Sequence, residues 1–470
     1  MNTVPWRGPT ALVLLATLSA CSSVGPNYRR PEVSLPASFR HAPETATATV
    51  LAPHTDRWWT IFADPTLDAL QAAAVEHSPT LPAALAARDA ALARRGLDRA
   101  ARRPTVNGSI DATLAGESAE RVVYTPGGLQ NIRETGDSYA LSVAAGYELD
   151  LWGRVRRLTE RADAQVEASE ADLAGARLSL AGDVAASYFR LRSAEAEARV
   201  LDQRLASQRE ILRLRQSRRV AGFTSEIDVA RDEAELHALV SDLADLRRRV
   251  ELEVNVLALL AGRTDPLPAA AAASLPEVPF GVPSELLRRR PDVRSAEAEL
   301  HARTAEIGAV QAARYPTIQL TGGGGFSSRE LDKFFNRPGQ FWGIGPSVSV
   351  PLLDGGRGRS QVAAARAAAA QAEAGFRQQL LVACREVEDA LVEARALAAR
   401  EDAQQRSRDA SAEVLRLTQL RYDRGLVSYF EVLAAQRTVL ELERALATLA
   451  GQRQLAAVRL VRALGGTWGT

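Results

Sequence analysis

An internal duplication is the feature that most constrains what this chain can fold into. The segment Ser78–Leu81 is echoed by Arg290–Val293, and Arg103–Thr105 is echoed by Tyr315–Thr317 at the same separation. A second constant separation relates three glycines of the first half to three of the second: Gly153 to Gly356, Gly222 to Gly425, and Gly262 to Gly465. A repeat of this length indicates two domain-sized copies of one unit rather than a short solenoid motif.

Both copies predict the same order of elements: a helix, a hairpin of two strands, a very long helix, a glycine turn and a returning helix. Pro104 and Pro316 end the first helix of each copy, because proline disfavours helix in the residue before it. We place the first unit at residues 66–264 and the second at 284–466. Their first helices are expected over Thr66–Arg102 and Ser284–Ala313, and their hairpins over 104–151 and 316–353. A proline-rich connector, 265–283, separates the units, and a short tail, 467–470, follows them.

The long helices are predicted over Val155–Val220 and Gly358–Arg424. A helix of roughly 65 residues would reach on the order of 100 Å, which no single globular domain requires. Apolar residues recur at spacings of three and four, as in Leu205, Ile211, Leu212 and Leu214. This pattern indicates helix-on-helix packing with a charged opposite face.

The hairpin strands alternate apolar or small residues with polar ones. In Thr105–Leu114, Val106, Ile110 and Leu114 share one face; in Ser138–Asp150, Leu141 and Val143 do so. About ten alternating residues are typical of a transmembrane β-strand, with its apolar side to lipid and its polar side to a lumen. A half-buried soluble sheet is the alternative that alternation alone leaves open.

Four strands in one chain cannot close a barrel around a channel. An open sheet edge in lipid would leave backbone N–H and C=O groups unpaired, at a cost of several kcal/mol each. The hairpins must therefore pair with those of other chains. Two chains would give eight strands with a filled interior, and three would give twelve with a lumen.

The N-terminus predicts export and lipid attachment. Arg7 precedes the short apolar stretch Ala11–Leu18, and Leu18–Cys21 reads Leu-Ser-Ala-Cys, which looks like a bacterial lipobox. Residues 1–20 are then a signal peptide, Cys21 carries the lipid, and 21–65 form an anchored N-terminal segment; an ordinary secretory signal is the alternative. Removal of the signal peptide leaves 57 Asp and Glu residues against 58 Lys and Arg less Arg7. The exported chain is formally neutral, which does not favour a nucleic-acid partner.

Several stretches, in this order, resemble the outer-membrane efflux protein family, which is TolC-like, and its NodT/OprM-like lipoprotein branch. They are Val24–Pro31, Trp58-Trp59 with Phe62, Asp64-Pro65 and Leu67, then Tyr147–Arg154, Leu287–Arg294, and Arg421–Gly425 through Gln436-Arg437. The resemblance implies a homotrimer with a twelve-stranded membrane β-barrel, a long α-helical periplasmic barrel and a mixed α/β equatorial region. It also implies a periplasmic adaptor protein and an inner-membrane transporter of the RND type as partners, so that the chain would be the outer-membrane duct of a tripartite efflux system.

The same resemblance implies a gate at the far ends of the long helices. Asp228 matches an acid that bonds a tyrosine of the neighbouring tip, here Tyr422, with Arg424 and Glu431 assisting. The turns at Gly222 and Gly425 would face the adaptor. Ser225–Asp228 and Ser428–Glu431 also have capping-box spacing, so both acids are equally expected to satisfy backbone N–H groups. The chain departs from the family at Ala434, where the branch often has aspartate, and at Val427, which takes the place of a gate arginine.

No catalytic or metal-binding pattern is present in the sequence. The five histidines are scattered without ligand spacing, and neither a nucleophile elbow nor a phosphate loop occurs. We therefore expect no enzyme activity and no cofactor besides the lipid on Cys21. A structural coiled-coil lipoprotein of the outer membrane, without channel activity, is the main alternative, and drugs, metals and other small molecules are all open as cargo.

Overall fold

The computed structural model describes residues 23–33, 38–41, 57–116, 122–125, 128–131, 135–262 and 289–466. They belong to two compact units. The first contains the β-sheet, α7 (Pro291–Ala312) from Glu297 onward, and the adjoining ends of the long helices. The second contains α2 (Pro65–His77), α5 (Glu226–Leu260), α9 (Tyr429–Ala463) and most of both long helices. Among the described helices, none combines the length and the hydropathy needed to cross a membrane.

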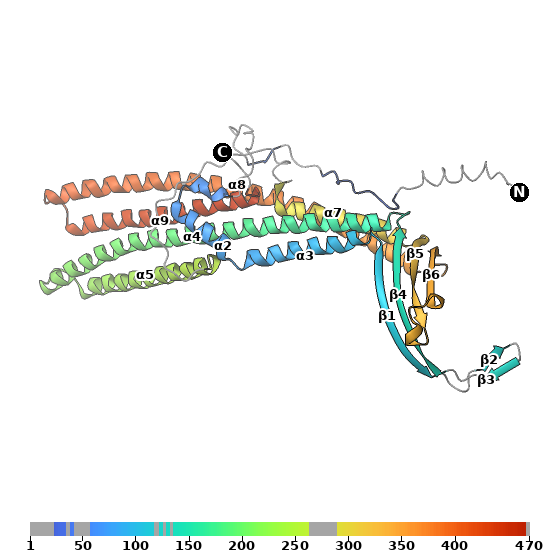
Figure 1. Cartoon of the computed structure of the whole chain (residues 1–470). Coiled ribbons are helices and arrows are strands. Elements are labelled where there is room, and N and C mark those ends of the chain that lie inside the picture. Colours follow the sequence, from blue (N-terminus) through green and yellow to red (C-terminus); the bar gives the residue numbers. More distant parts are fainter. Residues whose placement is uncertain are drawn as a thin grey trace. The chain divides into compact units, whose positions relative to one another are not determined.

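The element order repeats between the two halves of the chain (Figure 1). The long helices α4 (Arg154–Val220) and α8 (Arg357–Asp423) both have 67 residues, and the returning helices α5 and α9 both have 35. α4 and α5 form the first helical hairpin, and α8 and α9 form the second.

The helix predicted over Thr66–Arg102 is wrong as a single element. The structure contains α2 and a separate helix α3 (Thr80–Ala100), with Ser78 extended between them at ψ 131°. Pro79 forces this break because it excludes the helical conformation from the residue before it. In the second copy, α7 begins at Pro291, and most residues before it lie outside the described part of the chain.

The four long strands form one antiparallel sheet in the order β1-β4-β5-β6. They are β1 (Thr105–Gly116), β4 (Thr135–Leu149), β5 (Thr317–Ser328) and β6 (Gln340–Ser349). The first hairpin loop also holds a small hairpin of β2 (Val122–Thr125) and β3 (Gly128–Asn131), which the sequence analysis did not predict. The second loop holds two short 3-10 turns, η2 (Leu331–Lys333) and η3 (Arg337–Gly339).

The register brings apolar residues opposite apolar residues across β1, β4 and β5. Ile110 lies opposite Leu141, and Leu141 lies opposite Phe326. Gly325 makes this close pairing possible, since a Cβ there would lie 1.9 Å from the Leu141 carbonyl oxygen. On the other face, Ser109 and Ser142 are joined by a 2.8 Å hydrogen bond between their hydroxyls. The sheet thus has one apolar and one polar face, as the alternation predicted.

The tryptophan-rich segment before the first repeat contributes to the core of the second unit. The 3-10 helix η1 (Trp58–Phe62) buries both of its tryptophans and Phe62. Asp64 caps α2 by accepting from the backbone N–H of Thr66 at 2.9 Å, and Tyr188 of α4 donates its hydroxyl to the same carboxylate at 2.5 Å. These contacts fasten the start of the first repeat to α4.

Candidate functional site

The apolar face of the sheet is uncovered within one chain. Ile110, Leu114, Trp342 and Ile344 are between 73% and 84% exposed. An exposed apolar surface of this extent marks contact with lipid or with another protein. In the described part of the chain, the two outermost strands, β1 and β6, each pair on one side only. Each therefore offers a row of backbone donors and acceptors for another strand.

The first hairpin tip is a tight turn followed by a capped helix. Gly222 has φ +79°, a left-handed conformation that glycine adopts without strain. Asp228 accepts from the Ser225 hydroxyl at 2.7 Å, and the Asp228 backbone N–H donates to the same hydroxyl at 3.2 Å. The Ser225 hydroxyl, followed by the Ser225 backbone N–H and Thr224, lowers the pKa of Asp228. Asp228 is therefore an ionised capping residue at neutral pH.

The second tip repeats this geometry with different side chains. Gly425 has φ +72°, and its N–H donates to the Tyr422 carbonyl at 2.8 Å. Glu431 completes the capping box of α9 with Ser428. The Tyr422 ring contacts Tyr429, with centroids 5.2 Å apart. Arg424 is exposed in the turn.

The structure therefore distributes the predicted gate residues over two tips. Gly222 and Asp228 are on the first, and Tyr422, Arg424, Gly425 and Glu431 are on the second. In the described part of one chain, the hydrogen bonds of Asp228 stay within its own tip. A bond between Asp228 and Tyr422 would therefore have to form in another state or between chains.

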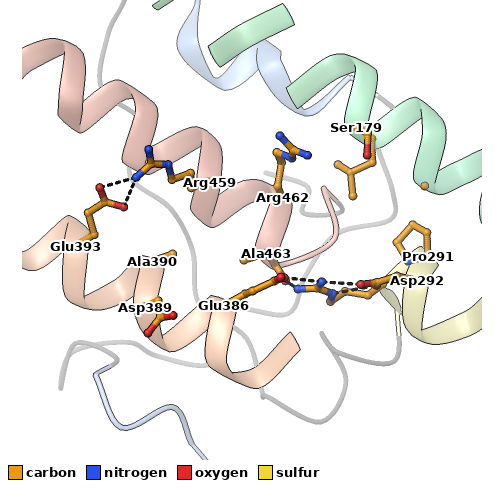
Figure 2. Close-up of a pocket in the computed structure, with 13 residues that line it drawn as sticks. Ser179, Pro291, Asp292, Glu386, Asp389, Ala390, Glu393, Arg459, Arg462 and Ala463 are labelled. Atoms are coloured by element: carbon orange, nitrogen blue, oxygen red, sulfur yellow. Dashed lines mark hydrogen bonds and ion pairs between the residues drawn. The ribbon is translucent and has the colours of Figure 1, made fainter. Parts of the chain in front are cut away.

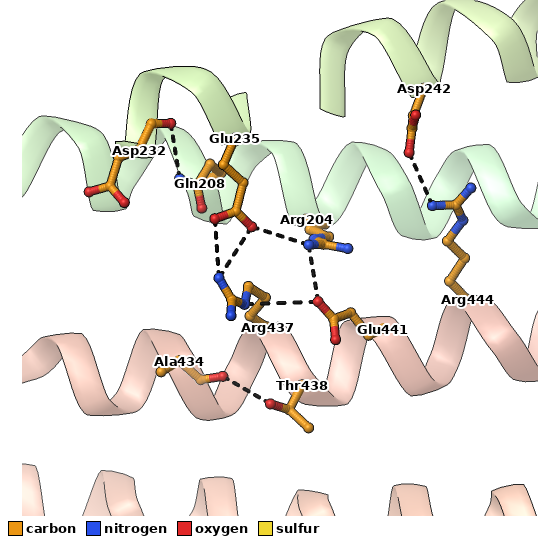
Figure 3. A network of polar contacts seen from close by, with 10 residues as sticks. All are labelled: Arg204, Gln208, Asp232, Glu235, Asp242, Ala434, Arg437, Thr438, Glu441 and Arg444. Carbon is orange, nitrogen blue, oxygen red and sulfur yellow. Dashed lines mark hydrogen bonds and ion pairs between the residues drawn. The ribbon is translucent and has the colours of Figure 1, made fainter. Parts of the chain in front are cut away.

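A charged contact that the sequence did not predict joins the two helical hairpins. Arg437 of α9 contacts Glu235 of α5 at 3.1 Å, and Glu235 also accepts from Arg204 of α4 at 3.2 Å. Glu441 of α9 lies 3.0 Å from Arg204 and closes the four-membered network (Figure 3). One turn further along α9, Arg444 reaches Asp242 of α5 at 3.4 Å. We call Arg204, Glu235, Asp242, Arg437, Glu441 and Arg444 the hairpin interface.

Closer to the tips, an aromatic side chain extends this contact. The Phe430 ring lies beneath two arginines of α4: the guanidinium carbons of Arg215 and Arg218 are 4.8 Å and 5.2 Å from the ring centroid. Such cation–π contacts are attractive because of the ring quadrupole. Phe430, Arg437 and Arg444 recur at every seventh residue, so they share one face of α9. That spacing was the sequence signal for this contact.

Arg290 ties three helices of the second unit together. It donates to the Ala463 carbonyl at 2.8 Å, to Asp292 at 2.7 Å and to Glu386 at 2.7 Å. Burial alone would raise the pKa of Asp292, but hydrogen bonds and charge from Arg290 lower it overall. Asp292 and Glu386 border a cavity of about 540 Å³ (Figure 2). The Arg-Pro-Asp motif thus fastens α7 to α8 and to the end of α9.

Two other expectations concern chemistry. Within the described ranges, no group of three or more His, Cys, Asp or Glu side chains could hold a metal ion. The lipidation site, Cys21, lies outside the described residues.

Comparison with known proteins places these features in context. The family description "Outer membrane efflux protein" matches residues 70–263 and again 282–466. The toluene efflux pump outer membrane protein TtgI of Pseudomonas putida is 32% identical over 471 residues, with 97% of each chain covered. The probable outer membrane lipoprotein SilC of Salmonella typhimurium is 27% identical over 456 residues, with 96% of each covered. The crystal structure of the open state of the Neisseria gonorrhoeae MtrE outer membrane channel is similar at a TM-score of 0.82 and 29% identity, covering 94% of this chain and 98% of that one.

Proposed function

The chain belongs to the outer membrane efflux protein family, and on that premise we propose that three copies form one continuous duct, which exports drugs or other toxic small molecules. Efflux through a channel of the outer membrane is the function shared by its relatives and structural neighbours. The family is one of channels rather than of enzymes.

The sheet is the part of the structure that most directly supports a trimer. Its four strands present an apolar face, and among the described residues its outermost strands have no partner on one side. Three such sheets joined edge to edge form a closed barrel of twelve strands, which leaves no edge in the lipid and encloses a lumen. The small, polar inner face, with Ser109, Ser142 and Thr321, suits a water-filled passage.

The helices extend the duct through the periplasm. Each chain contributes α4, α5, α8 and α9, so a trimer has twelve helices for a periplasmic barrel. The mixed region around α2, α3 and α7 forms its equatorial belt. The turns at Gly222 and Gly425 form the tips that meet a periplasmic adaptor, and the adaptor connects the duct to an inner-membrane transporter of the RND type.

Lipid on Cys21 provides a second membrane attachment. The lipobox at Leu18–Cys21 supports it, as does the relative SilC, whose name describes an outer membrane lipoprotein. The covalent lipid is the only attached group that the proposal requires, and the duct needs no cofactor. Substitution Cys21→Ala should abolish incorporation of labelled fatty acid, and persistent labelling would contradict the assignment.

Mass and conductance measurements test the duct itself. We expect detergent-solubilised protein, corrected for bound detergent, to have the mass of three chains, and single trimers in planar bilayers to conduct ions. A stable monomer would refute the shared barrel. A trimer that conducts nothing in any state would favour the coiled-coil lipoprotein without channel activity.

The tips form the gate of the resting duct. Three-fold symmetry brings three copies of Asp228 around the axis, where like charges attract cations and resist dehydration. We propose that Asp228 and Tyr422, assisted by Arg424 and Glu431, hold the tips together until the adaptor docks. The ionised state of Asp228 and the exposed position of Arg424 support this arrangement.

A double substitution tests the gate. Asp228→Ala with Tyr422→Phe should raise single-channel conductance and leave the trimer intact. Asp245→Ala is the matched control, because Asp245 is an exposed acid of the same helix whose ion pairs among the described residues run along that helix, to Arg248 and Arg249. Unchanged conductance in an assembled double variant would leave these residues with capping and packing roles alone.

A further inference from the structure

Residues 24–28, which lie just after Cys21 in the sequence, are bound tightly within the first unit. The Val24 N–H donates to the Trp152 carbonyl at 2.9 Å, just beyond the end of β4. Gly25 has φ +98° and lies against Gly308 of α7, where a Cβ on Gly25 would be 2.4 Å from the Gly308 Cα. A Cβ on Gly308 would in turn be 2.8 Å from the Val24 carbonyl oxygen. Two glycines therefore let the segment approach α7 at backbone distance.

Arg157 of α4 is the centre of this contact. Its side chain is only 3% exposed. Its Nε donates to the Val24 carbonyl at 3.3 Å, and its Nη2 donates to the Gly25 carbonyl at 3.3 Å and to Asn27 Oδ1 at 2.7 Å. Its Nη1 pairs with Glu160 at 2.8 Å. All three guanidinium nitrogens are thus used, a pattern that lysine cannot reproduce because its ammonium is a single point donor.

Tyr28 provides a second point of attachment. Its ring stacks on His301 of α7 with centroids 4.6 Å apart, and its hydroxyl donates to Glu297 at 3.1 Å. Burial, followed by the negative charge of Glu297, raises the pKa of Tyr28, so the hydroxyl keeps its proton and remains a donor. We call Arg157, Glu297, His301, Gly308 and the Trp152 carbonyl the N-terminal docking site.

The docking site lies where the sheet meets the helices. Trp152 donates its indole N–H to the Pro316 carbonyl at 2.8 Å and stacks on Tyr315 at 4.8 Å, so it joins the end of β4 to the start of β5. Only Ser22 and Ser23 separate Cys21 from Val24. Three Cα steps of about 3.8 Å keep the Cys21 Cα within about 11 Å of the Val24 Cα.

We propose that the N-terminal docking site fixes the position of the lipid anchor, with Arg157 as its positioning residue. It holds the acylated Cys21 at the level of the helix-side ends of β4 and β5, so that the acyl chains and the apolar face of the sheet enter the membrane together. A lipid on a loose tether would reach the membrane without aligning the sheet. The inference rests on the proposed lipidation of Cys21.

Trypsin measures how firmly the segment is held. The Arg29–Arg30 bond lies just past Tyr28, and its cleavage releases a lipopeptide of residues 21–29 that mass spectrometry identifies. In the intact trimer, Arg157→Ala should accelerate this cleavage by about tenfold, and Arg157→Lys should do so nearly as much. Arg156→Ala is the matched control, because the neighbouring Arg156 guanidinium pairs with Asp150 rather than with Val24, Gly25 or Asn27 in the described part of the chain. Equal cleavage rates in wild type and Arg157→Ala would overturn the docking role.

A spacer separates positioning of the lipid from simple stabilisation of the fold. Six glycine and serine residues inserted between Ser22 and Ser23 lengthen the tether and leave the docking contacts in place. Both the spacer variant and Arg157→Ala should lower the amount of trimer in the outer membrane, and to the same extent. Only the spacer variant should keep its protection against trypsin. If it assembles like wild type, Arg157 is merely structural and the inference fails. Fatty-acid labelling of the same samples distinguishes the remaining outcome: unlabelled wild-type protein would overturn lipidation, and this inference with it, whatever the conductance shows.

Discussion

The two contacts that α4 makes at one level of the helix differ in chemistry. Towards α5, Leu201 and Leu205 are buried in a cluster with Leu239, Leu243 and Leu246, which holds the first hairpin together. At the same level, Arg204 joins the charged network that reaches α9 of the second hairpin. Apolar burial is not screened by salt and is costly to undo, whereas partly exposed ion pairs contribute little each and are screened. From this difference we predict that each hairpin moves as a unit and that the two hairpins can separate from one another.

The largest effect is expected inside a hairpin. Leu246 is fully buried, and Leu246→Ala should lower the free energy of unfolding by about 3 kcal/mol, since truncation leaves a cavity. Urea unfolding followed by the helical circular dichroism signal measures it. Leu246→Met keeps the volume and is the control. If the free energy of unfolding fell equally in both variants, the leucine cluster would not be what stabilises the hairpin.

Removing a helix cap should cost less and should distinguish the two tips. Ser225→Ala removes the hydroxyl that exchanges hydrogen bonds with Asp228 and should cost about 1 kcal/mol of local stability. Ser428→Ala should cost less stability, because Ser428 contacts Glu431 through its backbone N–H at 3.5 Å, and the substitution keeps that N–H. Hydrogen exchange of the tip peptides reports both. A larger increase in exchange at the second tip in Ser428→Ala than at the first tip in Ser225→Ala would contradict this expectation.

The ion pair between Arg444 and Asp242, which joins the two hairpins, should contribute little to stability and should affect single-channel conductance. Arg444→Asp puts a second acid beside Asp242, and Asp242→Arg in the same chain restores an attractive pair. A double-mutant cycle should give a coupling of about 0.5 kcal/mol, as for exposed pairs. Conductance should rise in the single variant and return in the double one.

The control for that cycle is the Arg459–Glu393 pair, which lies within the second hairpin at 2.7 Å (Figure 2). Charge reversal there should change stability by a similar amount and leave conductance unchanged. If both pairs affect conductance equally, the hairpins do not move as separate units.

The smallest expected effect is that of pH on the first tip. Because the folded pKa of Asp228 is lowered, principally by the Ser225 hydroxyl, its contribution is complete above the ordinary aspartate pKa of about 3.9 and is lost as pH falls below that value. Exchange of the tip amides, corrected for intrinsic rates, should be constant between pH 7 and pH 5 and should rise below pH 4. The variant Asp228→Asn should show no such rise.

Much of the fold follows from local patterns. The long helices begin and end within a residue of their predicted bounds, and Gly222 and Gly425 occupy the turns expected of them. The apolar residues of the strands lie on one face because side chains alternate across a strand whatever its partner. The break at Ser78 was misjudged, although Pro79 signalled it. For the candidate site, capping-box spacing identified the local role of Asp228 and Glu431.

The sequence by itself determined periodicity, turn positions and the two faces of the strands, because each depends on residues a few positions apart. It also showed the duplication, because the two copies repeat the same residues in the same order. Only the tertiary structure decided which side chains meet across long stretches of chain. Arg437 could have paired with any of the many acids on the helices, and it lies against Glu235 because the two hairpins pack side by side. In the sequence, nothing distinguishes Arg157 from the other arginines of its helix. Its role in docking the N-terminal segment arises because Val24 and Gly25 fold back onto its guanidinium. The seven-residue spacing of Phe430, Arg437 and Arg444 marks a shared face of α9, but spacing and composition do not encode which distant residues such a face meets.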